Sequence, residues 1–182
     1  MTKQVLFVQG GGGGTHDDWD NKLVESLSKE LGPGYEIRYP VMPDEATPSY
    51  AAWKAALERE STLLEPGDIL IGHSLGGAIL INVLAERAPK RPGAICLIAA
   101  PFVGDGGWTS EDIEPRPDIA ARLPKGVPVF LYHGSEDEIV PFAHIELYSE
   151  AIPGAHVRRL NGRDHQLNNN LSEVAHDIRE LD

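Results

Sequence analysis

Cysteine, long apolar runs and positive charge are all scarce in this sequence of 182 residues. The single cysteine, Cys96, has no partner for an intramolecular disulfide, and its apolar surroundings, AICLIAA, predict a buried core thiol. No apolar run approaches the roughly 20 residues of a membrane-spanning helix. The run near the start, in MTKQVLFVQG, is too short for the core of a signal peptide and predicts a strand. Together these absences suggest a cytoplasmic protein.

The charge balance narrows the range of partners. Asp and Glu number 28 against 16 Lys and Arg, which gives a formal net charge of −12. No basic cluster is present that would pair with a phosphate backbone, so neither a nucleic acid nor an anionic membrane is expected as a partner. No His, Cys, Asp or Glu cluster has metal-ligand spacing, and we expect neither a metal nor a cofactor. The sequence carries no signal of an oligomeric state.

Strand-length apolar runs alternate with helical patterns along the whole chain. The predicted strands are Gln4–Val8, Glu36–Tyr39, Asp68–Gly72, Ala94–Ala99, Pro128–Tyr132 and Ala155–Leu160. The intervening apolar stripes predict helices over residues 19–31, 50–64, 75–87, 142–148 and 167–181, with Thr47 as the cap of the second. We therefore predict a single α/β domain over residues 1–182, a three-layer sandwich with a mostly parallel sheet of about six strands.

A serine lies between two glycines at one predicted strand-to-helix junction. Gly72-His73-Ser74-Leu75-Gly76 fits the pattern G-x-S-x-G, in which a sharp turn exposes the serine hydroxyl and the glycines avoid collisions with neighbouring backbone. The pattern alone is short enough to arise by chance, and a simple turn serine is the alternative. Its position between an apolar strand and a helix favours a nucleophile, Ser74.

A serine nucleophile needs a base, and the base needs an orienting acid. His165 follows the last predicted strand, and Asp137 follows the strand before it. Carboxyl ends of parallel strands share one edge of a sheet, so both side chains are expected near Ser74. Asp105, after the strand over residues 94–99, is a second candidate for the acid. His73 and His133 are interpreted as structural.

These motifs resemble the α/β-hydrolase superfamily along the whole chain. The specific matches are GHSLGG, the G-x-x-D-x-x-V-P stretch from Gly134 to Pro141, and His165 before the final helix. The resemblance implies Ser74 as nucleophile, His165 as general base and acid, and Asp137 as orienting acid. It also implies an oxyanion hole from the backbone N–H groups of Leu75 and of the loop after the first strand.

The chain differs from the family pattern in three respects. Gln9-Gly10 stands where many relatives have His-Gly, and four more glycines follow, so Gly11 is favoured as the second oxyanion donor with Gly12 as the alternative. The family's usual two leading strands are missing, which suggests a minimal six-stranded sheet. No segment is large enough for a helical lid domain.

The substrate pocket is harder to predict. His16, Trp19 and Trp108 are candidates to line it, with His16 and Trp108 as the expected substrate-binding residues, although aromatic side chains more often serve packing. The Gly- and Pro-rich interval over residues 101–126 is either a loop that covers the substrate or a plain surface loop. The glycine run over residues 10–14 lacks the Lys and the glycine spacing of a phosphate-binding loop.

The sequence thus favours a serine hydrolase that acts on a small-molecule carboxylic ester through an acyl-enzyme. The same three residues also serve thioester or amide hydrolysis, or perhydrolysis. A non-catalytic module that keeps the pocket as a ligand-binding site is the alternative from a different class.

Overall fold

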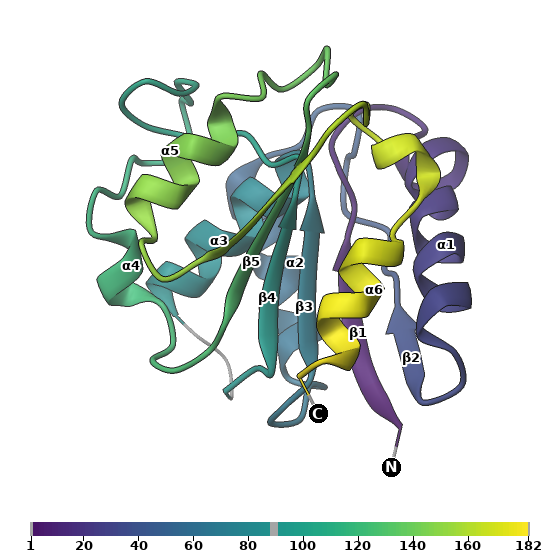
Figure 1. Ribbon diagram of the computed structural model, residues 1–182. Coiled ribbons are helices and arrows are strands. Elements are labelled where there is room, and N and C mark those ends of the chain that lie inside the picture. Colours follow the sequence, from purple (N-terminus) through teal and green to yellow (C-terminus); the bar gives the residue numbers. More distant parts are fainter. Residues whose placement is uncertain (1, 88–90, 182) are drawn as a thin grey trace.

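The computed structural model describes residues 2–87 and 91–181 and contains one six-stranded sheet (Figure 1). All neighbouring strands pair in parallel. The strands are β1 (Lys3–Val8), β2 (Tyr35–Arg38), β3 (Ile69–His73), β4 (Ala94–Ile98), β5 (Val129–Gly134) and β6 (His156–Leu160). The prediction of a sheet of about six mostly parallel strands is confirmed, and the predicted strand ends differ from these by at most two residues.

The strand order, β2-β1-β3-β4-β5-β6, places a reversal at β1. From β1 the chain moves outward to β2 and then returns across β1 to β3, after which each new strand is added on the same side. Loops that leave β1 and β3 therefore diverge above the sheet, and this kind of switch point opens a crevice at the carboxyl ends of the strands. The serine follows β3 and the glycine run follows β1, so both lie at this crevice.

Helices cover both faces of the sheet (Figure 1). α1 (Asn21–Leu31) and α6 (Ser172–Arg179) pack together on one face. The other face carries α2 (Tyr50–Ser61), α3 (Leu75–Glu86), α4 (Ile119–Arg122) and α5 (His144–Ala151). A π-helical turn, η1 (Thr15–Asp20), precedes α1, and a short 3-10 turn, η2 (Leu167–Asn169), precedes α6.

Burial on both faces explains why the central strands are apolar throughout. In β3, Ile69 and Ile71 pack toward α1 and α6, whereas Leu70 packs toward α2 and α3. Alternate residues of a strand point to opposite faces, so a strand covered on both sides needs apolar side chains at every position. Each fully buried aliphatic side chain contributes about 1.5–3 kcal/mol relative to exposure. Cys96 is fully buried in β4, as predicted.

Two local predictions are wrong. Ser49, not Thr47, caps α2, because its hydroxyl accepts the N–H of Ala52 while Thr47 lies in the preceding turn. The predicted last helix is broken, since Leu167, Asn168 and Asn169 adopt positive φ angles of 47°, 55° and 53°. The apolar stripe over residues 167–181 therefore begins in this turn and continues in α6. Within the described residues, no helix has both the length and the apolar character to cross a bilayer.

Candidate active site at the carboxyl edge of the sheet

The serine occupies a strained turn between β3 and α3. Ser74 has φ 52° and ψ −129°, a conformation that L-residues rarely adopt, and its own N–H donates to the carbonyl of Ile98 at 2.8 Å. The turn points the hydroxyl away from the sheet into the crevice. Strain of this kind persists only where the surrounding structure imposes it.

The flanking glycines are required by close backbone contacts. A Cβ on Gly76 would lie 1.9 Å from the carbonyl oxygen of Gln9, and one on Gly72 would lie 2.5 Å from the Cα of Gly77. Strand β1, strand β3 and the first turn of α3 thus approach one another more closely than any side chain permits. The reason given for the glycines from sequence, a collision with neighbouring backbone, agrees with this geometry.

The structure brings Ser74, His165 and Asp137 into one hydrogen-bonded chain. Nε2 of His165 lies 3.0 Å from the Ser74 hydroxyl, and its Nδ1 lies 2.8 Å from Oδ2 of Asp137. The three residues come from the loops after β3, β5 and β6. Asp105, the other candidate acid, lies exposed on the loop after β4 and makes no such contact with His165 among the described residues.

Asp137 is held in its charged form. Burial opposes its charge, but hydrogen bonds from His133 and His165 and from the backbone N–H of Val140 outweigh it and keep the pKa of Asp137 well below its usual value. Nε2 of His133 lies 3.1 Å from Oδ2 of Asp137. His133 therefore contacts the carboxylate directly, and its structural role is to hold Asp137 in place.

Two backbone N–H groups near Ser74 are free to bind a ligand. Leu75 begins α3, where the helix dipole favours negative charge, and its N–H has no acceptor within residues 2–87 and 91–181. The same holds for Gly11, whose Cα faces the Leu75 side chain so closely that a Cβ there would lie 2.8 Å from Cδ2. The N–H of Gly12 instead donates to the Glu45 carbonyl at 2.6 Å. Of the two candidate glycines, only Gly11 thus keeps a free donor.

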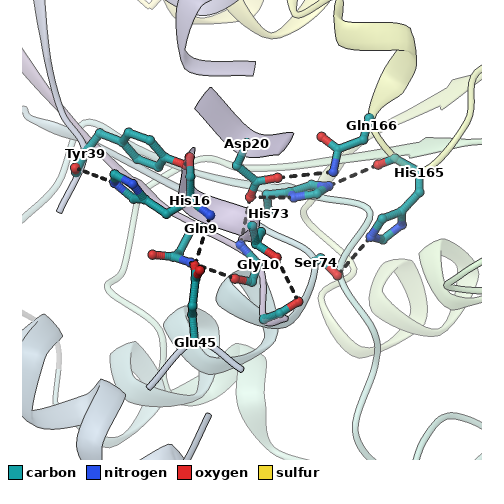
Figure 2. A network of polar contacts seen from close by, with 12 residues as sticks. Gln9, Gly10, His16, Asp20, Tyr39, Glu45, His73, Ser74, His165 and Gln166 are labelled. Carbon is teal, nitrogen blue, oxygen red and sulfur yellow. Dashed lines mark hydrogen bonds and ion pairs between the residues drawn. The ribbon is translucent and has the colours of Figure 1, made fainter. Parts of the chain in front are cut away.

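Glu45 holds the glycine run in place. Its carboxylate accepts the N–H group of His16 at 3.0 Å and the Gln9 side-chain amide at 2.6 Å (Figure 2). It also accepts the N–H group of Gly14 at 2.7 Å. These bonds keep the pKa of Glu45 below its usual value, although burial acts in the opposite direction. The loop is therefore anchored at several points along its length despite its composition.

A cavity of about 610 Å³ opens beside the serine. Its lining comprises Gly10, Gly11, Thr15, Trp19, His73, Ser74, Glu136, Glu138, Ile139, Asp164, His165 and Gln166. The volume suits a small ligand. The side chains of Trp19 and Ile139 are 55% and 62% exposed, so they offer apolar surface at its mouth.

Neither expected substrate-binding residue lines this cavity. The His16 ring stacks on Tyr39 with centroids 4.0 Å apart, which turns it toward β2 (Figure 2). Trp108 packs edge-on against His144 and borders a separate cavity of about 630 Å³ between α5 and the loop over residues 101–126. The expectation for both residues is corrected on this point: within η1 the ring of His16 turns away from the cavity, whereas Trp19 of the same turn lines it, and Trp108 lies at the other cavity.

Comparison with known proteins identifies the family of this chain. The sequence model described as the alpha/beta hydrolase family matches residues 5–175. The chain belongs to the α/β-hydrolase family. No curated protein matches this α/β-hydrolase significantly. Among the residues that the structure describes, no group of three or more His, Cys, Asp or Glu side chains is arranged to hold a metal ion.

Solved structures similar to this α/β-hydrolase include several of about its own size. An esterase domain from Rhodothermus marinus shares 25% identity with a TM-score of 0.67, over 98% of this chain and 84% of that one. The ydeN gene product of B. subtilis shares 20% identity with a TM-score of 0.75, over 99% and 98%. A serine hydrolase without a lid, from Xanthomonas campestris, shares 16% identity with a TM-score of 0.67, over 100% and 82%.

Sequence reasoning missed two carboxylates that organise the site, Asp20 and Glu45. Asp20 is one of three aspartates in THDDWD and nothing in the pattern marks it as the buried one. Glu45 lies in a turn with no motif of its own. The only available signal was indirect, since a loop of five glycines needs acceptors for its backbone N–H groups.

Proposed function

We propose that this α/β-hydrolase is a serine hydrolase that cleaves small carboxylic esters with Ser74, His165 and Asp137. The observation that carries the proposal is the chain of hydrogen bonds from the Ser74 hydroxyl to His165 at 3.0 Å and on to Asp137 at 2.8 Å. This is the arrangement in which a serine, a base and an orienting acid act together. The similarity to an esterase domain lends support to an ester as the substrate.

In the proposed reaction, Oγ of Ser74 attacks the ester carbonyl carbon while Nε2 of His165 takes its proton. The negative charge that develops on the carbonyl oxygen is stabilised by the N–H groups of Leu75 and Gly11. Collapse of this intermediate breaks the bond to the alcohol, which leaves with the proton from His165. A water molecule then loses a proton to His165 and attacks the acyl carbon, after which the bond to Oγ of Ser74 breaks. His165 returns the proton to Oγ, and the acid is released.

Asp137 contributes by orienting the base. Its charged carboxylate accepts the Nδ1–H of His165, which leaves the Nε2 lone pair directed at Ser74 and stabilises the imidazolium that forms in the reaction. Because the pKa of Asp137 lies well below its usual value, the carboxylate remains ionised across the neutral range.

Covalent labelling with a fluorophosphonate probe, followed by mass spectrometry, tests the proposal. We expect an adduct on Ser74 that is absent in Ser74→Ala and strongly reduced in His165→Ala, with hydrolysis of a short-chain aryl ester lost in parallel. Ser61→Ala is the matched control, because that hydroxyl donates to the carbonyl of Glu58 within α2, and its loss should leave labelling unchanged.

Unlabelled Ser74 in folded wild-type protein would contradict the proposal and favour a ligand-binding module without catalysis. A profile over matched ester, thioester and amide substrates, with and without hydrogen peroxide as acyl acceptor, tests the ester assignment. A preference for any of the other three reactions would overturn that assignment while leaving Ser74 as the nucleophile.

A further inference from the structure

A buried carboxylate and a buried imidazole lie directly beneath the proposed nucleophile. The exposed fractions of Asp20 and His73 are 0% and 1%. Oδ2 of Asp20 lies 2.9 Å from Nδ1 of His73 and also accepts the N–H of Gly10 at 2.8 Å (Figure 2). Its other oxygen, Oδ1, accepts the Gln166 side-chain amide at 3.2 Å. The reaction described above uses neither Asp20 nor His73.

The geometry assigns a positive charge to His73. Its Nδ1 faces the Asp20 carboxylate, and its Nε2 lies 3.0 Å from the backbone carbonyl of His165. Both partners are acceptors only, and a neutral imidazole carries a single N–H, so it would leave one nitrogen lone pair against an oxygen. The imidazolium satisfies both contacts.

Electrostatics agree with this charge. Burial disfavours a charged His73, yet the Asp20 carboxylate and the hydrogen bonds to His73 raise its pKa above the usual value. The pKa of Asp20 is correspondingly lowered, against the effect of its own burial. The other titratable groups that face His73 are His165, whose ring centroid is 4.9 Å away, and Asp137, which adds a smaller favourable field.

The pair joins three of the four loops that carry the proposed machinery. His73 is the last residue of β3 and directly precedes Ser74. Its Nε2 binds the backbone of His165, and Asp20 binds both Gln166, which follows His165, and Gly10, which precedes the proposed oxyanion donor Gly11. Asp20 itself ends η1, so the pair links strand ends that are distant in the sequence.

We propose that Asp20 and His73 form a charged positioning pair that sets the distance between Ser74 and His165 and fixes the glycine loop beside them. This proposal rests on the proposed function and deepens it. A buried ion pair is weak evidence for a stabilising role, because replacing such pairs with apolar groups is often neutral or stabilising. Its placement between the nucleophile, the base and the oxyanion loop is the feature that a purely stabilising role leaves unexplained.

The test compares Asp20→Asn and His73→Gln with a variant that breaks an ion pair elsewhere, between the buried Asp177 and the 40% exposed side chain of Arg158. Asp177 is 7% exposed and binds Arg158 through both carboxylate oxygens. It does not line the cavity beside Ser74. Asp177→Asn therefore removes a comparable buried charge away from the site. All variants are compared by aryl-ester kinetics, by the rate of fluorophosphonate labelling and by thermal unfolding.

We expect Asp20→Asn to lower kcat by about 100-fold with little change in KM, because a displacement of the order of an ångström between reacting groups has an effect of that size. His73→Gln should lower kcat similarly, and the double variant should lose little more than either single one, since both break the same pair. Asp177→Asn should reduce thermal stability and leave the kcat of the folded protein unchanged.

Nitrogen-15 NMR of histidine-labelled wild-type protein gives a second, activity-independent readout. We expect two protonated ring nitrogens on His73 at neutral pH, and loss of that signature in Asp20→Asn. This measurement needs only the wild-type fold, so it decides the charge on the pair even if a variant does not fold.

The outcomes are separable. Wild-type kcat in folded Asp20→Asn and His73→Gln, or a neutral His73 in the wild-type spectrum, would overturn the positioning pair while Ser74 labelling still supports the hydrolase. A loss of activity that follows thermal stability equally in Asp177→Asn would also overturn it. If wild-type protein neither labels nor hydrolyses esters, the proposed function fails, and the positioning role fails with it.

Discussion

The strained conformation of Ser74 leads to a prediction about stability rather than rate. At φ 52° and ψ −129°, the Cβ of any L-residue at this position is crowded against backbone, whereas glycine adopts such angles freely. Gly10 leaves room for the Ser74 side chain, since a Cβ placed at position 10 would lie 3.2 Å from the Ser74 Cβ. Ser74→Gly should therefore be more stable than Ser74→Ala, although alanine usually folds better than glycine.

The magnitude follows from two opposing effects. Relief of backbone strain contributes about 1–3 kcal/mol. The greater conformational freedom of glycine in the unfolded chain costs about 0.5–1 kcal/mol relative to alanine. Both variants lose the hydroxyl that contacts His165, so that contribution cancels in the comparison. Taking the middle of each range, the net gain is about 1 kcal/mol, or a rise in Tm of about 2–4 °C for a domain of this size.

Differential scanning calorimetry and urea unfolding of the two variants would measure this difference. The control is Ala55→Gly, the same exchange at an exposed position inside α2, which should destabilise the protein by about 1 kcal/mol. If Ser74→Gly unfolded at or below the temperature of Ser74→Ala while Ala55→Gly showed its usual loss, the turn at Ser74 would carry no backbone strain of this size.

Three further predictions concern packing, reactivity and pH. Gly76→Ala should destabilise the protein severely, because the new Cβ would lie 1.9 Å from the Gln9 carbonyl, whereas Gly154→Ala, with nothing within 4 Å, should change the urea midpoint little. The Cys96 thiol should resist a thiol reagent such as DTNB in native protein and react only in denaturant, since burial removes access and raises its pKa. The pKa of Asp137 is lowered in the folded protein, so its contribution to stability should be present above about pH 4 and be lost as the pH falls through the folded pKa. Urea unfolding of wild type and Asp137→Asn should therefore give different free energies of unfolding at neutral pH and similar ones in acid.

The sheet was predictable because its central strands leave a strong signal. Strands buried on both faces must be apolar at every position, and β3, β4 and β5 each stand out between polar loops. Helix ends were less predictable, because capping depends on one local hydrogen bond. Ser49 and Thr47 are both good capping residues, and the hydroxyl that reaches an N–H decides between them.

The chain order of the serine, the acid and the histidine was also readable from the sequence, since each follows a different parallel strand and all carboxyl ends share one edge. The residues that line the pocket could not be predicted in this way, because they depend on the path that long loops take across that edge. Neither the stacking of His16 on Tyr39 nor the packing of Trp108 on His144 has a local sequence signature.

The glycine loop combines two requirements that the sequence satisfies with different residues. Glycine gives the backbone room to approach α3, where a Cβ on Gly11 would press against Leu75. Glycine also makes a loop costly to order, because it has more conformational freedom to lose. Asp20 and Glu45 offset that cost by accepting backbone N–H groups at the start and end of the run. The glycines inside the loop thus allow the close approach, and the two carboxylates outside it hold the loop rigid. Weakening either carboxylate should therefore loosen the proposed oxyanion donor without altering the space around it.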